Sequence, residues 1–111
     1  AHRVGMTRAK EIVLLNKTLA AQEATDIGLY NWTVPADELT SQAQKIADQL
    51  ADGPTVAHSL AKKALRDALR MPFDAFMDVE ALSMAFLITT EDQKEGLKAF
   101  GEKRPPKFQG R

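Results

Sequence analysis

The chain contains no cysteine among its 111 residues. This excludes a disulfide scaffold and thiolate chemistry, and it fits the cytoplasm or another reducing compartment. No apolar run approaches the roughly 18 residues that a membrane-spanning helix needs, so we expect no membrane partner. Charge of one sign is not in excess either, because 15 basic residues balance 15 acidic ones. We therefore expect no global field that would draw the chain to nucleic acid.

Apolar residues recur with a helical period along most of the sequence, and a chain of this length makes one domain or part of one. Gly28 is expected to end the second helix. The β-branched and aromatic residues of Leu29–Val34 form the only strand-like segment, which Pro35 ends. The predicted fold class is all-α, with about six helices over Arg8–Leu15, Ala21–Ile27, Asp37–Ala51, Thr55–Leu69, Phe73–Ile88 and a last helix that begins at Thr90.

The start of the last helix carries the clearest local signal. Thr90 and Gln93 have the spacing of a capping box, and Glu91 and Asp92 suit the positive end of the helix dipole. In the helix Thr55–Leu69, by contrast, the inward face is predicted from a stripe of small and apolar residues: Ala57, Leu60, Ala61, Ala64, Leu65 and Ala68.

The segment Phe73–Ile88 is apolar on most of its faces. A helix of this kind must be covered on more than one side, and two or three small neighbours cannot cover it. The strand-like segment also lacks a partner strand in this chain. Both features predict a partner, which is another domain, another subunit or both.

An aromatic ring and an ammonium group stand close together near the end of the chain. Phe100 and Lys103 are three residues apart, which at helical spacing would place them on one face. Such a pair can stack on a nucleobase and neutralise a phosphate. The alternative is a core aromatic residue beside a solvated lysine, and spacing alone favours that alternative.

Three stretches, taken together and in this order, resemble the enoyl-CoA hydratase/isomerase (crotonase) family over the whole chain. Each stretch alone is a weak signal. They are Leu14-Leu15-x-x-x-Leu19-x-Ala21-x-Glu23-Ala24-x-x-x-Gly28-Leu29-x-Asn31-x-x-Val34-Pro35, then Gly53-Pro54 with Ala61-Lys62, and Glu95-Gly-x-x-Ala-Phe-x-x-Lys-Arg-Pro-Pro-Lys-Phe.

The resemblance implies that residues 1–111 are the C-terminal helical region of a crotonase-like acyl-CoA enzyme, a lid and trimerisation region. The family's ββα spiral, absent here, would precede Ala1 with the oxyanion-binding amides and catalytic carboxylates. The parent enzyme would hydrate or isomerise acyl-CoA thioesters through an oxyanion-stabilised enolate, as a homotrimer or dimer of trimers. Coenzyme A would be the substrate carrier, without a prosthetic group. Phe100 would pack near its adenine and Lys103 would meet its phosphates.

Two positions depart from the family pattern. Asn16-Lys17 stands where the family commonly has Thr-Gly, and Ala20 stands where it commonly has an N-cap serine. The second change is expected to weaken a helix start by about 1 kcal/mol. Neither departure affects the predicted chemistry.

No catalytic residue and no metal site are predicted within the chain. His2 and His58 lie too far apart in sequence, without ligands at helical spacing, to form a metal site. A catalytic carboxylate needs burial or a partner that holds its pKa near the working pH. The glutamates all fit exposed helical faces or a cap instead: Glu11, Glu23, Glu80, Glu91, Glu95 and Glu102.

Two other functions are compatible with the sequence. A non-enzymatic helical module could use Phe73–Ile88 for oligomerisation or partner docking. A nucleic-acid-binding tail is a weaker reading, although Lys94–Arg111 holds six basic residues against two acidic ones. The zero net charge of the chain argues against that reading.

Overall fold

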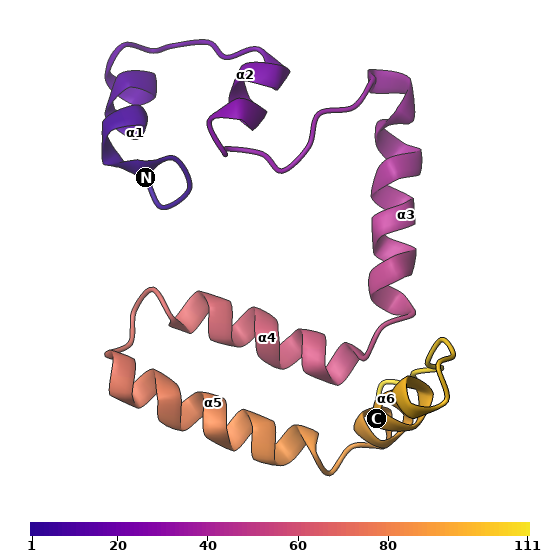
Figure 1. Cartoon of the computed structure of the whole chain (residues 1–111). Helices are drawn as coiled ribbons and strands as arrows, with labels where there is room; N and C mark the ends of the chain where they lie inside the picture. Colours follow the sequence, from indigo (N-terminus) through magenta and orange to yellow (C-terminus); the bar gives the residue numbers. More distant parts are fainter. The chain divides into compact units, whose positions relative to one another are not determined.

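The computed structural model describes all residues 1–111 and contains only helices, turns and loops. The chain forms two compact units, Ala1–Gln42 and Ala43–Arg111, which are described separately. The predicted all-α class is confirmed (Figure 1). Its elements are α1 (Gly5–Leu14), α2 (Ala21–Asp26), the 3-10 turn η1 (Ala36–Glu38), α3 (Leu39–Ala51), α4 (Thr55–Asp67), α5 (Phe73–Leu87) and α6 (Glu91–Gly101).

In the first unit, α1 and α2 end in the same backbone motif. Asn16 and Gly28 follow the two helices with positive φ angles of 49° and 77°. The next amide N–H then turns back over the helix end: Lys17 donates to the Ile12 carbonyl at 2.9 Å. These are Schellman ends, in which glycine or asparagine adopts the left-handed conformation at little cost. The predicted role of Gly28 is therefore confirmed.

Helix α2 begins without a side-chain cap. Its N-cap is Ala20, and no side chain accepts a hydrogen bond from the first turn. A separate contact ties the helix to α1, because the Lys17 ammonium lies 3.4 Å from Glu11 and 2.8 Å from Glu23. The lysine thus joins α1 to α2. Ala24 is the one buried residue of the unit.

The segment Leu29–Val34 is not a strand, and that prediction was wrong. The amide of Leu29 donates to the Ala24 carbonyl at 2.8 Å, which uses it to close the end of α2. The Thr33 hydroxyl donates to the Ala21 carbonyl at 3.0 Å and folds the segment onto the same helix. A strand needs a neighbouring ladder, and here local bonds take up these groups instead. Trp32 remains 66% exposed.

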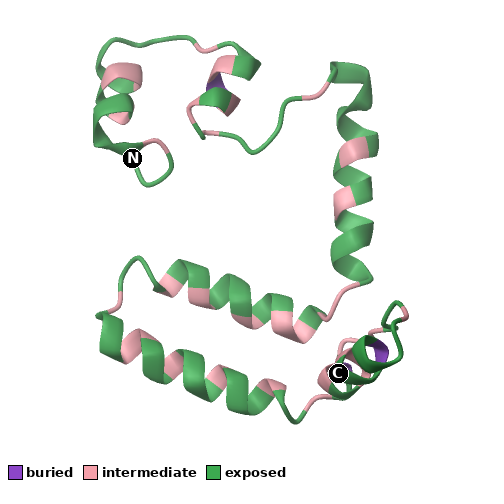
Figure 2. Cartoon of the chain, in the orientation of Figure 1, coloured by how far each residue is buried: buried purple, intermediate pink, exposed green.

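In the second unit, α4 and α5 pack against each other as an antiparallel pair (Figure 1). Leu60 and Ala64 of α4 and Phe76 and Val79 of α5 are half-buried. The predicted inward face of α4 is only partly right, because Leu65 is 74% exposed. Only α5 packs along α4, so the covered face of α4 is narrower than the apolar face predicted from the sequence (Figure 2).

Helix α5 keeps much of its apolar surface in solvent. Phe73, Leu82 and Phe86 are 74%, 72% and 56% exposed. This confirms that the helix carries more apolar surface than its neighbours in the chain cover. None of the helices has the length and apolar character needed to span a bilayer.

Candidate functional site

The start of α6 is fixed by the residue that the sequence predicted. The Thr90 hydroxyl oxygen accepts a hydrogen bond from the Gln93 amide at 3.2 Å. The reciprocal half of a capping box is replaced, because the Thr90 amide donates to the Leu87 carbonyl at 3.0 Å. Thr90 therefore connects the end of α5 to the start of α6.

The end of α6 is a third Schellman end, and Lys103 occupies its left-handed position with φ of 51°. The Lys103 amide donates to the Phe100 carbonyl at 3.2 Å, and the Arg104 amide donates to the Ala99 carbonyl at 3.1 Å. Because α6 ends at Gly101, Lys103 lies beyond the helix. The argument that helical spacing places it on one face with Phe100 is therefore wrong.

Both predicted site residues are nevertheless presented at the surface of this chain. The Phe100 side chain is 87% exposed, which rules out a core position within the chain. Lys103 is also exposed, and no carboxylate of the chain forms a salt bridge with it. The ring in the last turn of α6 and the ammonium just beyond that turn are thus both exposed.

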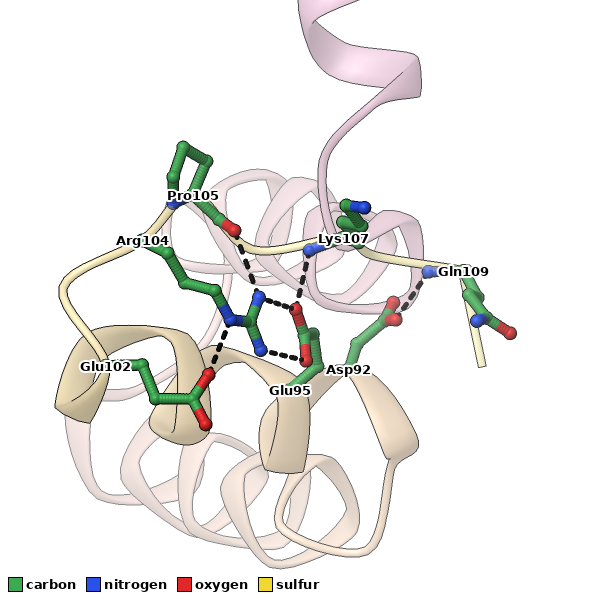
Figure 3. Close-up of polar contacts among 7 residues, drawn as sticks. All are labelled: Asp92, Glu95, Glu102, Arg104, Pro105, Lys107 and Gln109. Carbon is green, nitrogen blue, oxygen red and sulfur yellow. Dashed lines mark hydrogen bonds and ion pairs between the residues drawn. The ribbon is translucent and has the colours of Figure 1, made fainter.

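Glu95 of α6 holds Arg104, a residue of the basic tail 102–111 that follows the helix. Its carboxylate oxygens lie 2.6 Å and 3.0 Å from Nη1 and Nη2 of Arg104, which is a two-point contact. The same guanidinium donates through Nε to Glu102 at 2.6 Å (Figure 3). The prediction that Glu95 occupies an exposed helical face was wrong, since its side chain is only 21% exposed.

Two carboxylates of α6 accept hydrogen bonds from main-chain amides of the tail. Glu95 accepts from the Lys107 amide at 2.8 Å. Asp92 accepts a hydrogen bond from the Gln109 amide at 2.7 Å (Figure 3). It also accepts one from the Gly110 amide at 2.9 Å. Asp92 is 5% exposed, so these bonds replace its hydration. The tail is therefore folded back along α6.

These contacts fix the charge state of the Glu95 and Arg104 pair. The Arg104 guanidinium, followed by the Lys107 amide, lowers the pKa of Glu95 from 4.5 to about 2. Glu95, in turn, raises the pKa of Arg104 above its usual range. Both groups are ionised at neutral pH, so Glu95 stays a hydrogen-bond acceptor and has no role in proton transfer.

Within the second unit, the tail also packs against α6 and α4 through an aromatic ring and a glycine. A side chain added at Gly96 would meet the Phe108 ring at 3.7 Å, so that ring lies over α6. At Gly110, φ is 71° and a Cβ would come within 2.6 Å of the Thr55 hydroxyl of α4. Glycine is required there by both backbone conformation and space.

The basic character of the tail is partly offset in space. A hollow of about 300 Å³ lies between α6 and the tail, and its lining has mixed charge. The excess of cations counted along the sequence is therefore accompanied by three carboxylates. The charged lining residues are Lys94, Lys98, Lys107 and Arg111, with Glu91, Asp92 and Glu95.

Neither histidine belongs to a cluster of metal-ligating side chains. The His58 ring lies over Gly53, where an added Cβ would come within 2.3 Å of it. No group of three His, Cys, Asp or Glu side chains has the proximity needed to hold a metal ion. The surface at the end of α6 instead carries the Phe100 ring and the Lys103 ammonium, and these groups are suited to binding rather than to metal coordination.

Known proteins match the chain from end to end. The model of the enoyl-CoA hydratase/isomerase family matches residues 1–111. A protein of Rhodobacter capsulatus named "Probable enoyl-CoA hydratase" is 38% identical over 109 residues, covering 98% of this chain and 42% of that protein. The crotonyl-CoA hydratase of Syntrophomonas wolfei is 35% identical over 105 residues, covering 95% of this chain and 40% of the relative.

The fold agrees with these matches. The crystal structure of an enoyl-CoA hydratase from Geobacillus kaustophilus superposes with a TM-score of 0.93 at 35% identity. That superposition covers 100% of this chain and 42% of the other. The chain thus spans about two-fifths of the length of the relatives it matches. From its first residue to its last, this chain belongs to the enoyl-CoA hydratase/isomerase family.

Proposed function

We propose that this chain is the C-terminal helical part of an enzyme that acts on acyl-CoA thioesters. The observation that carries the proposal is that all 111 residues match the family model. The chain spans about two-fifths of the length of the relatives it matches. One of these relatives is named for the hydration of crotonyl-CoA. Hydration or isomerisation through an oxyanion-stabilised enolate is the reaction proposed for the parent enzyme, and coenzyme A is the carrier of its substrate.

Within that enzyme, the residues of this chain bind and cover the substrate and leave proton transfer to other residues. Phe100 is the apolar plate for the adenine ring, which its 87% exposure supports. Lys103 supplies an ammonium for the phosphates of the nucleotide. Glu95 holds the tail and stays ionised, so it does not act as a general acid or base near neutral pH.

The exposed apolar face of α5 supports the second part of the proposal. Phe73, Leu82 and Phe86 are too exposed for the chain to be complete as a monomer. We assign this surface to the acyl pocket and to subunit contacts in a homotrimer or a dimer of trimers. The enzyme would work in the cytoplasm or another reducing compartment.

Calorimetric titration of the chain with crotonyl-CoA, together with a hydration assay, tests whether these residues bind the substrate without catalysing the reaction. We expect weak binding and no turnover. Robust turnover by residues 1–111 alone would show that the chemistry was placed wrongly. Absence of any affinity for coenzyme A would remove the nucleotide role of Phe100 and Lys103.

The Lys103→Ala substitution tests the site when the chain replaces the matching part of a hydratase. We expect KM for the CoA ester to rise by an amount equivalent to roughly 1–3 kcal/mol, because a charge-assisted hydrogen bond is lost. The value of kcat should change less. Lys45→Ala, on α3, is the matched control, since it removes an exposed ammonium elsewhere. A collapse of kcat with unchanged KM contradicts the assignment.

The exposed α5 face also favours a second candidate, a non-enzymatic oligomerisation or interaction module. This candidate predicts defined oligomers with no affinity for coenzyme A. Light scattering after size exclusion, with and without coenzyme A, distinguishes the two functions.

A further inference from the structure

Lys103 occupies a backbone position that a lysine seldom takes. Three helices of the chain end in the same motif, with Asn16, Gly28 and Lys103 at the left-handed position. Glycine has no Cβ to clash there, and asparagine is the next most tolerant residue. A lysine in this conformation is strained, and it stays there only when its surroundings fix the backbone.

The Schellman bonds of the Lys103 and Arg104 amides hold the turn itself, and side-chain contacts restrain the residues around it. The residues on both sides of Lys103 are tied together, because Arg104 Nε lies 2.6 Å from the Glu102 carboxylate. The same guanidinium is held at two points by Glu95, two turns back in α6. Glu95 also accepts a hydrogen bond from the Lys107 amide at 2.8 Å. This bond restrains the chain just after Pro105 and Pro106.

We infer that Glu95, acting through Arg104, is a positioning residue for the Lys103 ammonium. The inference rests on the proposed function, because the ligand in question is the anionic nucleotide end of coenzyme A. Glu95 does not touch that ligand. Its carboxylate holds the Arg104 guanidinium, and that guanidinium holds Glu102. Both neighbours of Lys103 are thereby restrained, and the lysine backbone is kept in the conformation that presents its side chain.

Glu95 is the central member of this arrangement. It contacts Arg104 through both oxygens, whereas Glu102 makes one contact and its side chain is 48% exposed. A lysine at position 104 would keep the charge and lose the planar two-point contact. The Glu91 and Lys94 pair, at 2.7 Å on the same helix, is the matched control, because both of its side chains are 63% exposed and neither forms a hydrogen bond or salt bridge with the tail.

The first experiment measures the Lys103 backbone directly by NMR. The 13Cα and 13Cβ shifts and the HN–Hα coupling of Lys103 report a left-handed conformation in the unaltered chain. We expect Glu95→Gln and the milder Arg104→Lys to move these values toward those of a random coil, while Glu91→Gln leaves them unchanged. The amide spectrum of α4 shows that each variant is folded. A Lys103 that stays left-handed in both Glu95→Gln and Arg104→Lys overturns the inference.

The second experiment measures affinity for coenzyme A and for 3′-dephospho-coenzyme A. We expect Glu95→Gln to weaken binding of coenzyme A by roughly three- to tenfold and to reduce the discrimination between the two ligands. In the Lys103→Ala background the same substitution should add no further loss. Independent, additive losses would show that Glu95 does not act through Lys103.

The two experiments separate the failure of the inference from the failure of the proposed function. If Lys103→Ala leaves the affinity for coenzyme A unchanged, the nucleotide role is wrong, whatever Glu95 does to the backbone. If Lys103→Ala weakens binding but Glu95→Gln changes neither the Lys103 conformation nor the affinity, the site stands and the positioning role of Glu95 falls.

Discussion

The α6 helix with its tail and the α4–α5 pair differ in how far their surfaces are covered by the chain itself. The tail is folded onto α6 by carboxylates that accept main-chain amides, and the segment holds both buried residues of its unit, Asp92 and Ala99. The α4–α5 pair buries no residue fully. Polar bonds to its own chain thus complete one region, while the other keeps an apolar face that needs a partner.

Removal of the Asp92 carboxylate should have the largest effect on this contrast. In Asp92→Ala the amides of Gln109 and Gly110 lose their acceptor, which should cost about 2–3 kcal/mol. Faster hydrogen exchange at these two amides and a lower free energy of unfolding are the readouts. Asp78→Ala on the exposed side of α5 is the control and should change stability little. Unchanged protection at 109 and 110 would mean that Asp92 does not hold the tail.

Acid should release the tail in a defined pH range. The pKa of Glu95 is lowered from 4.5 to about 2 by Arg104 and the Lys107 amide. Because the folded-state value is the lower one, the stabilisation is present in full above pH 4.5 and is lost as the pH falls through 2. A carboxyl 13C titration of Glu95, followed together with the Lys107 amide, should give a midpoint near 2. A midpoint at the ordinary value of 4.5 contradicts the two-point contact.

Relief of the strain at Lys103 should separate stability from binding. Lys103→Gly keeps the helix end and removes the left-handed penalty, so we expect an increase in stability of about 1 kcal/mol. Affinity for coenzyme A should fall because the ammonium is gone. Chemical denaturation and calorimetry measure the two effects. A loss of stability would indicate that the lysine side chain makes contacts within the chain.

The smallest effect on the chain itself is expected on the apolar side of the comparison. Leu82 is 72% exposed, so Leu82→Lys should change the stability of the chain by less than about 0.5 kcal/mol. The same substitution should reduce self-association, as measured by light scattering. Glu80→Lys, on the same helix, tests whether charge alone is responsible. Equal behaviour of the two variants would remove α5 from the proposed interface.

Much of the fold could be predicted from the sequence because helical patterns are local. The stop at Gly28, the cap at Thr90 and the exposed apolar surface of α5 follow from neighbours within one or two turns. The strand predicted for residues 29–34 is absent. The β-branched and aromatic residues fit a strand pattern, but the first amides of the segment donate to a carbonyl at the end of α2. Propensity describes the residues and does not say where their hydrogen bonds go.

The candidate site could be predicted only in part, for the same physical reason. Phe100 and Lys103 were identified from a resemblance, and the helical spacing first offered for them does not hold beyond Gly101. The roles of Asp92 and Glu95 depend on partners nine to eighteen residues away in a tail without periodicity. The available signal was the pair of prolines after Arg104, which ends the helical path and allows the chain to reverse.

Recognition through the main chain leaves the tail unusually tolerant of substitution. At positions 107 and 109 the bonds to α6 use only amide hydrogens. Any side chain except that of proline can therefore replace Lys107 or Gln109 without removing the bond. Gly110 is the exception, because of its positive φ and the nearby Thr55 hydroxyl. A saturation library of positions 107, 109 and 110 should return a nearly flat profile at the first two positions and a sharp requirement for glycine at the third.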